Sequence, residues 1–156
     1  MTITDQHAVT PFVGRELINP TTGTRTVFRA TAASTGGAWV EVEQTYPPHS
    51  RTPPRHLHPA QDEHFTVISG VLHAVVGDDE SDVLPGEVLD VLRGTPHQMW
   101  GASDEPTVVV WRTTPALRTD QMYCDLWSAA AANEFVPDLM AAYEVTLRYA
   151  AEFRLC

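Results

Sequence analysis

The sequence predicts an all-β fold, a barrel of short strands followed by an α-helical tail, and three observations predict it. Short apolar or alternating segments follow one another between residues 24 and 116, with no helical pattern between them. The chain contains 12 Pro and 9 Gly, which supply the turns that many short strands need. After Pro115 the sequence becomes rich in Ala, and apolar residues recur three and four positions apart.

Along the chain, residues 1–23 contain many turn-forming residues and predict an irregular lead-in that packs on the barrel. Residues 24–118 are expected to form the barrel. Glycine and proline turns separate its segments, for example at Gly77-Asp78-Asp79 and Pro85-Gly86. Six segments have the pattern of strands: Arg25–Thr31, Ala38–Tyr46, Phe65–Ile68, Val71–Val76, Val88–Leu92 and Thr107–Arg112.

Residues 119–156 are expected to form the helical tail. Its apolar stripe should pack against the barrel wall or against a second subunit, since its polar face is not basic enough for a membrane surface. The residues of this stripe are Val136, Leu139, Met140, Tyr143, Leu147 and Ala150.

Composition excludes several classes of function. A chain of 156 residues fits one domain, and its net charge of −10 opposes binding to nucleic acid or to an anionic membrane. All ten basic residues are Arg, so Schiff-base chemistry and the P-loop lysine are excluded. Cys124 and Cys156 are expected to be reduced thiols, and the N-terminus lacks a signal sequence, so a cytoplasmic protein is expected.

The chemistry is concentrated in the segment from Pro54 to Gly70. Side chains two positions apart on a strand share a face, so His56 and His58 can both bind one metal ion. Pro59 interrupts this strand and resets its register, after which Glu63 offers a carboxylate on an otherwise apolar face. A shift of one residue in that break would offer Asp62 instead. A third imidazole is available from His97, which follows Pro96 at the start of a returning strand.

These residues resemble the two motifs of the cupin family. His56-x-His58-(x4)-Glu63-(x6)-Gly70 resembles the first motif, and Gly86-(x5)-Leu92-x-Gly94-(x2)-His97 resembles the second. The resemblance implies a double-stranded β-helix, also called a jelly-roll barrel, with metal ligands at His56, His58, Glu63 and His97. It also implies a homodimer, which the apolar stripe of the tail favours independently.

Three positions depart from the family pattern. Ser50 stands where the first motif usually opens with Gly, and Leu92 stands where the second usually has Pro. Gly101 stands where the second motif usually has Asn. None of the three is a ligand position, so these departures affect the turns before His56 and His97 rather than the expected ion.

Other residues are weaker candidates for the site. His64 should face away from the ligands, and His7 and His49 lie in irregular segments. Candidates for a catalytic acid or base are His73, Gln98 and Tyr123. Five residues are candidates for lining a substrate pocket: Phe65, Val67, Met99, Trp100 and Trp111.

Three imidazoles and one carboxylate would leave coordination positions open on a divalent ion. Fe(II), Mn(II), Ni(II) and Zn(II) all suit this ligand set, which does not choose among them. We expect a metal-dependent enzyme that acts on a small organic substrate inside the barrel, and a dioxygenase-type oxidoreductase is favoured. The alternatives are a redox-neutral enzyme, in which the metal polarises an oxygen of the substrate, and a non-catalytic binding protein.

Overall fold

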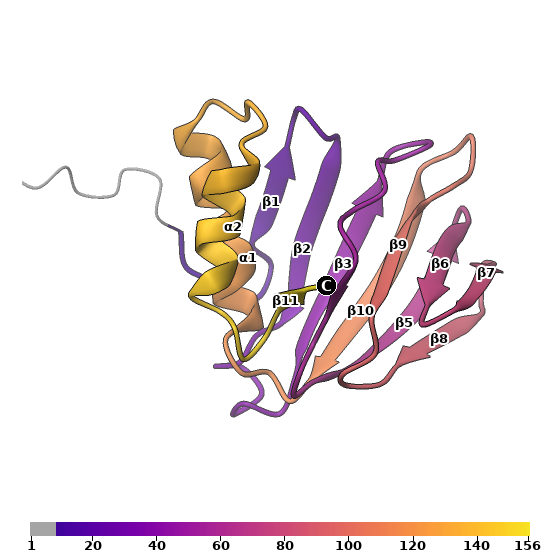
Figure 1. Cartoon of the computed structure of the whole chain (residues 1–156), viewed down its shortest axis with the longest axis horizontal. Helices are drawn as coiled ribbons and strands as arrows, with labels where there is room; N and C mark the ends of the chain where they lie inside the picture. The colour runs from indigo at the N-terminus through magenta and orange to yellow at the C-terminus, as the bar shows by residue number, and fades with distance from the viewer. Residues whose placement is uncertain (1–8) are drawn as a thin grey trace, which may run out of the picture.

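The computed structural model describes residues 9–156, so His7 lies outside the described residues. Eleven strands and two helices follow one another there (Figure 1). The strands are β1 (Glu16–Asn19), β2 (Thr24–Ala30), β3 (Val40–Tyr46), β4 (His56–Leu57), β5 (Asp62–Ser69), β6 (Leu72–Val76), β7 (Asp79–Val83), β8 (Val88–Val91), β9 (His97–Gly101), β10 (Thr107–Thr114) and β11 (Arg154–Leu155). The helices are α1 (Thr119–Ala132) and α2 (Leu139–Leu147).

Two antiparallel sheets face each other and form the double-stranded β-helix that the sequence predicts. One sheet has the order β1-β2-β3-β10-β5-β8, and the other has the order β11-β4-β9-β6-β7. Residues from the inner faces of both sheets pack together, with Phe65 and Val67 from one sheet against Leu72, Ala74 and Met99 from the other. This core occupies one half of the molecule, and the candidate site lies beside it.

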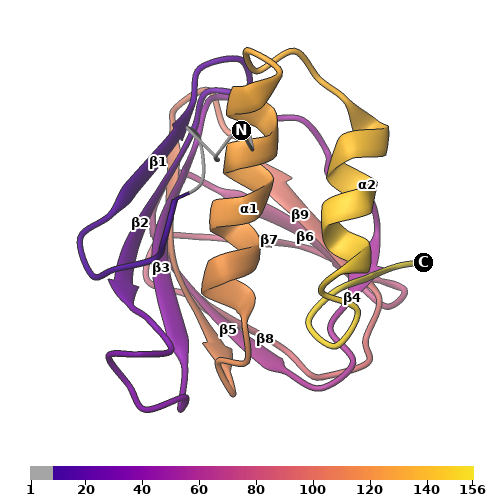
Figure 2. The same ribbon diagram turned by 90° about the vertical axis from the view of Figure 1, so that its left-hand side faces the viewer.

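The two helices cover the part of the first sheet that the second sheet does not face (Figures 1 and 2). Helix α1 packs Cys124 and Trp127 against Leu17, Phe28 and Val42 of strands β1, β2 and β3. Helix α2 lies on α1 through Val145 and Tyr149, which contact Met122. The two helices therefore form a wall beside the sheets, and the cavity described below lies between the helices and the barrel. Among residues 9–156, no helix is both long and apolar enough to cross a membrane.

Some elements differ from the expected ones. The expected irregular lead-in contains β1, which pairs with β2 from Glu16↔Val27 to Asn19↔Thr24. The acidic segment Asp79–Val83, which was not among the expected strands, forms strand β7, because an edge strand tolerates charged side chains that face water. The tail is not wholly helical, since it ends in strand β11.

The expected packing of the tail's apolar stripe against the barrel wall is wrong. Leu139 is 81% exposed, Met140 67% and Leu147 57%, and Ala150 is also exposed. The tail consists of two helices separated by residues 133–138, and this break changes the phase of the pattern. The buried face of α2 is instead the face that carries Val145.

The exposed stripe leads to a prediction about assembly. Apolar patches of this kind on a soluble protein usually mark a contact surface, so we expect a homodimer that buries α2. Because burying a Leu side chain is worth roughly 1.5–3 kcal/mol, Leu139→Glu combined with Leu147→Glu should produce monomers. Sedimentation of the wild type and the variant measures this. Leu92→Glu is the matched control, since Leu92 is 67% exposed and directly follows β8, which lies far from α2 in Figure 1. A monomeric wild type would contradict the prediction.

Candidate metal centre

The barrel brings the predicted ligands together from three strands. Strand β4 starts at His56, which lies directly opposite His97 of β9 in the second sheet. The chain leaves β4 at once, and the main-chain carbonyl of His58 accepts a hydrogen bond of 2.8 Å from the N–H of Gly94 in the turn before β9. Glu63, the second residue of β5, reaches the same place from the first sheet.

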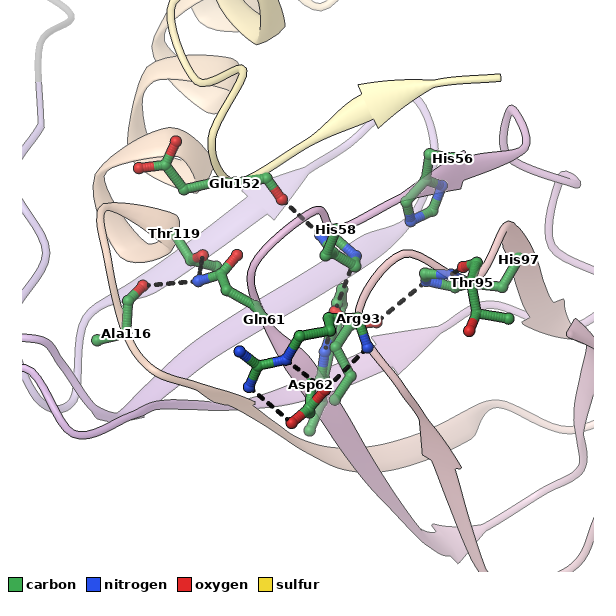
Figure 3. Close-up of polar contacts among 12 residues, drawn as sticks. His56, His58, Gln61, Asp62, Arg93, Thr95, His97, Ala116, Thr119 and Glu152 are labelled. Carbon is green, nitrogen blue, oxygen red and sulfur yellow. Dashed lines mark hydrogen bonds and ion pairs between the residues drawn. The ribbon is translucent and has the colours of Figure 1, made fainter.

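The break after Pro59 sets the facing of β5 as predicted. Glu63, Phe65 and Val67 are all buried, whereas His64 and Ile68 are exposed on the outer face. Asp62 also lies on the outer side, where both its carboxylate oxygens accept hydrogen bonds from Arg93 (Figure 3). The structure therefore places Glu63, and not Asp62, beside the imidazoles.

Each imidazole is held by its Nδ1 atom. Nδ1 of His56 lies 2.9 Å from the carbonyl of Pro54, and Nδ1 of His97 lies 2.8 Å from that of Thr95. Nδ1 of His58 lies 2.6 Å from the carbonyl of Glu152 (Figure 3). A carbonyl oxygen only accepts hydrogen bonds, so Nδ1 carries the hydrogen and Nε2 has a free lone pair in all three residues.

The remaining donor atoms meet at one point. One ligand atom from each of the three histidines lies within 4.8 Å of the others, so this group could hold a metal ion. Nε2 of His58 lies 3.1 Å from Oε1 of Glu63, and Nε2 of His97 lies 3.0 Å from Oε2. The indole N–H of Trp111 donates to Oε1 of Glu63 at 2.9 Å and fixes the carboxylate.

Several of these buried atoms lack a hydrogen bond of good geometry. They are Nε2 of His58, Nε2 of His97 and Oε2 of Glu63. Leaving a buried polar atom unsatisfied costs about 1–3 kcal/mol, so three such atoms aimed at one point need a common partner. A divalent cation would satisfy all of them, and the donor set of imidazoles and a carboxylate suits a transition metal.

Electrostatics of the centre favour the forms that bind metal. Burial lowers the pKa of His56 to about 4, so this imidazole is neutral at neutral pH. Burial alone would raise the pKa of Glu63, but the imidazoles of His58 and His97 lower it to about 2. Burial also opposes the charged form of His58, but Glu63 beside it raises its pKa overall. A proton therefore competes with a metal ion more strongly at His58 than at His56.

The centre opens on a cavity of about 550 Å³ between the barrel and the helices. His56, Glu63 and His97 line it, and so do the predicted pocket residues Phe65, Met99 and Trp111. Helix α1 contributes Leu126 and Ala129, and the segment around α2 contributes Val136, Leu139 and Ala142. The lining is mainly apolar, which is typical of a site for a small organic molecule.

Other predicted site residues lie elsewhere. Val67 is fully buried in the core, and Trp100 faces outward, because alternate residues of β9 face inward, with His97 and Met99 on the inner side. His73 lies on the same outer face, where it contacts Trp100 and pairs with Asp82 and Glu80.

The two remaining catalytic candidates do not line the cavity either. Gln98 faces outward between His97 and Met99 and approaches only the carbonyl of Pro53. Tyr123 packs behind Trp111, with ring centroids 5.6 Å apart. The structure therefore does not place His73, Gln98 or Tyr123 at the cavity.

Two residues that sequence reasoning missed lie at the site. Tyr46, the last residue of β3, lines the cavity, and Phe153 stacks on His56 with ring centroids 4.6 Å apart. Tyr46 could have been suspected, because it shares a strand face with the buried Val42 and Gln44. Phe153 carries no such signal, since its contact with His56 depends on how the tail returns to the barrel.

Two departures from the cupin pattern contact each other at the rim of the cavity. The N–H of Gly101 donates to Oγ of Ser50 at 2.8 Å, and the N–H of Ser50 donates to the carbonyl of Gly101 at 3.0 Å. A Cβ at Gly101 would lie 2.9 Å from Cβ of Tyr46. Glycine at this position therefore lets β9 approach Tyr46 closely.

The fold and the three-histidine group together define a class, the double-stranded β-helix with a candidate metal centre. Residues 42–112 match the family model of the cupin domain. Among solved structures, the chain is similar to the cupin domain of Schizosaccharomyces pombe Cnp3, with a TM-score of 0.54 and 9% identity over 75% of this chain and 74% of that one. It is also similar to a sugar phosphate isomerase of the cupin superfamily from Silicibacter pomeroyi, with a TM-score of 0.51 and 23% identity over 59% of each chain.

Residues 42–112 of this chain therefore resemble a cupin domain, and the fold is the one that the cupin structures share. A curated relative from Arthrobotrys oligospora, named as an oxidoreductase, is 34% identical over 85 residues. The match covers 49% of this chain but only 33% of the relative. The aligned segment is thus about a third of the relative's length.

The metal centre predicts that some histidine variants lose metal binding and that others keep it. His56→Ala, His58→Ala and His97→Ala should each weaken metal binding by more than about 100-fold, because losing even an outer partner of a ligand costs 10–100-fold. His64→Ala should bind normally, since His64 faces outward and pairs with Asp90. Metal content of the purified variants measures this, with Tm as the check on folding. A wild type that takes up none of Fe(II), Mn(II), Ni(II) or Zn(II) would contradict the assignment.

Metal binding should also depend on pH in a defined direction. An imidazole must be neutral to bind, and the raised pKa of His58 keeps its proton to a higher pH than the ordinary value of about 6.5. Affinity should therefore fall as the pH drops through that region. Glu63, with a pKa of about 2, stays ionised throughout. Chelator competition between pH 8 and pH 5 measures the effect, and a constant affinity over that range would refute it.

Proposed function

We propose that this protein is a metal-dependent oxidoreductase of the dioxygenase type, acting on a small organic molecule in the cavity. The observation that carries the proposal is that the candidate ligands open on a mainly apolar cavity, in which no side chain of residues 9–156 other than the candidate ligands is free to act as a base. The named oxidoreductase from Arthrobotrys oligospora supports the reaction class over the segment that it shares with this chain.

The cavity has the size and lining that such a substrate needs. Its volume of about 550 Å³ lies within the range of about 300–1,000 Å³ found for small-molecule sites. Phe65, Met99 and Trp111 present apolar surface beside the ligands, and Leu126 presents it from the opposite side. An apolar molecule with one or two oxygen atoms would bury its body there and direct the oxygens to the metal.

The titratable groups of the cavity argue against proton abstraction. Among residues 9–156, the lining contains Tyr46, Arg51 and Asp138 besides the candidate ligands. Burial raises the pKa of Tyr46, so its phenol stays protonated, and arginine does not lose its proton either. The carboxylate of Asp138 accepts hydrogen bonds from the N–H groups of Met140 and Ala141, because it caps α2.

A bound redox-active ion would supply electron exchange with O2, and this chemistry does not call for a side-chain base. The protein's own residues then hold and orient the substrate. Phe65, Met99 and Trp111 exclude water from it, and Trp111 also fixes the carboxylate of Glu63. Tyr46 can donate a hydrogen bond to a substrate oxygen.

That hydroxyl of Tyr46 also favours a second candidate function. A protonated phenol in the cavity could serve as the acid of a redox-neutral reaction, in which a metal polarises an oxygen of the substrate. An isomerase or lyase of this kind would need only the positive charge of the ion.

Metal exchange separates the two candidates. A panel of small oxygen-containing molecules would be screened for O2 consumption and for product formation under air and under nitrogen. The proposed oxidoreductase should lose turnover without O2, and also when Zn(II), which has no redox chemistry, replaces Fe(II), Mn(II) or Ni(II). Tyr46→Phe should reduce its rate only several-fold. Anaerobic turnover by the Zn(II) form that Tyr46→Phe abolishes would instead establish the redox-neutral reaction.

A further inference from the structure

The strand that carries His56 depends on the C-terminal strand. Strand β4 has two residues, and its register with β9 consists of the one pair His56↔His97. On its other side β11 pairs with it at Arg154↔Leu57 and Leu155↔His56. The N–H of Cys156 extends this pairing by donating to the carbonyl of Arg55 at 3.2 Å. Most of the main-chain support for β4 therefore comes from residues about a hundred positions later.

The tail also orients His58. Its Nδ1 lies 2.6 Å from the main-chain carbonyl of Glu152, and both groups are buried (Figure 3). Because the carbonyl only accepts, this contact fixes the hydrogen on Nδ1 and directs the lone pair of Nε2 towards Glu63. His56 and His97 use carbonyls two residues before themselves, so His58 differs from them in relying on a distant segment.

The ring of Phe153 packs against two of the imidazoles. It stacks on His56 with ring centroids 4.6 Å apart and an interplanar angle of 22°. It meets His58 edge-on, with centroids 6.0 Å apart and an angle of 66°. One phenyl ring thereby restricts the rotation of both imidazoles.

The segment that makes these contacts is itself anchored. The carboxylate of Glu152, in a residue only 2% exposed, accepts hydrogen bonds from the N–H and Nε of Arg118 at 3.2 and 3.3 Å. The N–H of Phe153 donates to the carbonyl of Tyr149 at 2.8 Å, and Tyr149 is buried against α1. The position of the tail is therefore fixed by both helices.

We propose that Glu152 and Phe153 are a functional part of the metal centre. Phe153 and the main-chain carbonyl of Glu152 act as positioning groups that hold His56 and His58 in the orientation that binds metal. This inference rests on the metal centre of the proposed function but not on its reaction. It makes metal affinity depend on docking of the helical tail, which cupin motifs alone would not predict.

Zn(II) affinity of the full chain tests the proposal. Phe153→Ala should weaken Zn(II) binding by about 10–100-fold in chelator competition, the usual cost of losing an outer partner of a ligand. Phe153→Leu keeps an apolar contact without the stacked ring and should fall between this variant and the wild type. Leu155→Ala is the matched control, because it lies in the same strand with a side chain 45% exposed, and it should bind within about twofold of wild type.

The imidazole tautomer provides a readout that needs neither metal nor turnover. Long-range ¹⁵N–¹H spectra of the metal-free wild type should show His58 with its hydrogen on Nδ1, and Phe153→Ala should give a mixture of tautomers. Unchanged Zn(II) affinity and an unchanged tautomer in Phe153→Ala would overturn the proposal, as would an equal loss of affinity in Leu155→Ala. Tm values of the metal-free variants show whether each one folds. A wild type with the Nδ1 tautomer but no metal affinity would overturn the proposed function instead.

Discussion

The geometry of the metal centre depends on the hydrogen bonds between the imidazole Nδ1 atoms and main-chain carbonyls. They leave every Nε2 lone pair unengaged, and the barrel directs these atoms to one buried point beside Glu63. Two of the carbonyls, those of Pro54 and Thr95, precede their own histidine by two residues. The third belongs to Glu152, so folding of the barrel and docking of the tail meet at His58.

The same docking shapes the cavity. In this chain the sheets line only part of the cavity, and α1, the segment around α2 and the loops before β2 and β4 line the rest. Apolar side chains such as Leu126 and Val136 therefore line the same cavity as the candidate ligands. The candidate ligands lie within the segment that matches the cupin domain, residues 42–112, whereas the helices that line the cavity lie outside that segment.

Local periodicity predicted which donor side chains gather at one point, but it predicted their surroundings poorly. The facing of Glu63 followed from the proline break and the two-residue repeat of a strand, which are properties of neighbouring residues. Trp100 faces away from the cavity because it lies three residues after His97 in β9, and side chains an odd number of positions apart on a strand point to opposite faces. Phe153 reaches the site through the return of the tail, which no local pattern records, whereas the alternation of β3 already placed Tyr46 on the face of Val42 and Gln44. The apolar stripe of the tail was wrongly expected to be buried, because the tail forms two helices and the break between them changes which face is buried.

The close approach of Gly101 to Tyr46 makes one glycine a constraint on the shape of the cavity. A Cβ at position 101 would lie 2.9 Å from Cβ of Tyr46, which lines the cavity, and the N–H of Gly101 donates to Oγ of Ser50. A larger residue at position 101 would therefore press on Tyr46 while leaving every candidate ligand in place. The shape of the cavity thus depends on a position that is not itself one of the candidate metal ligands.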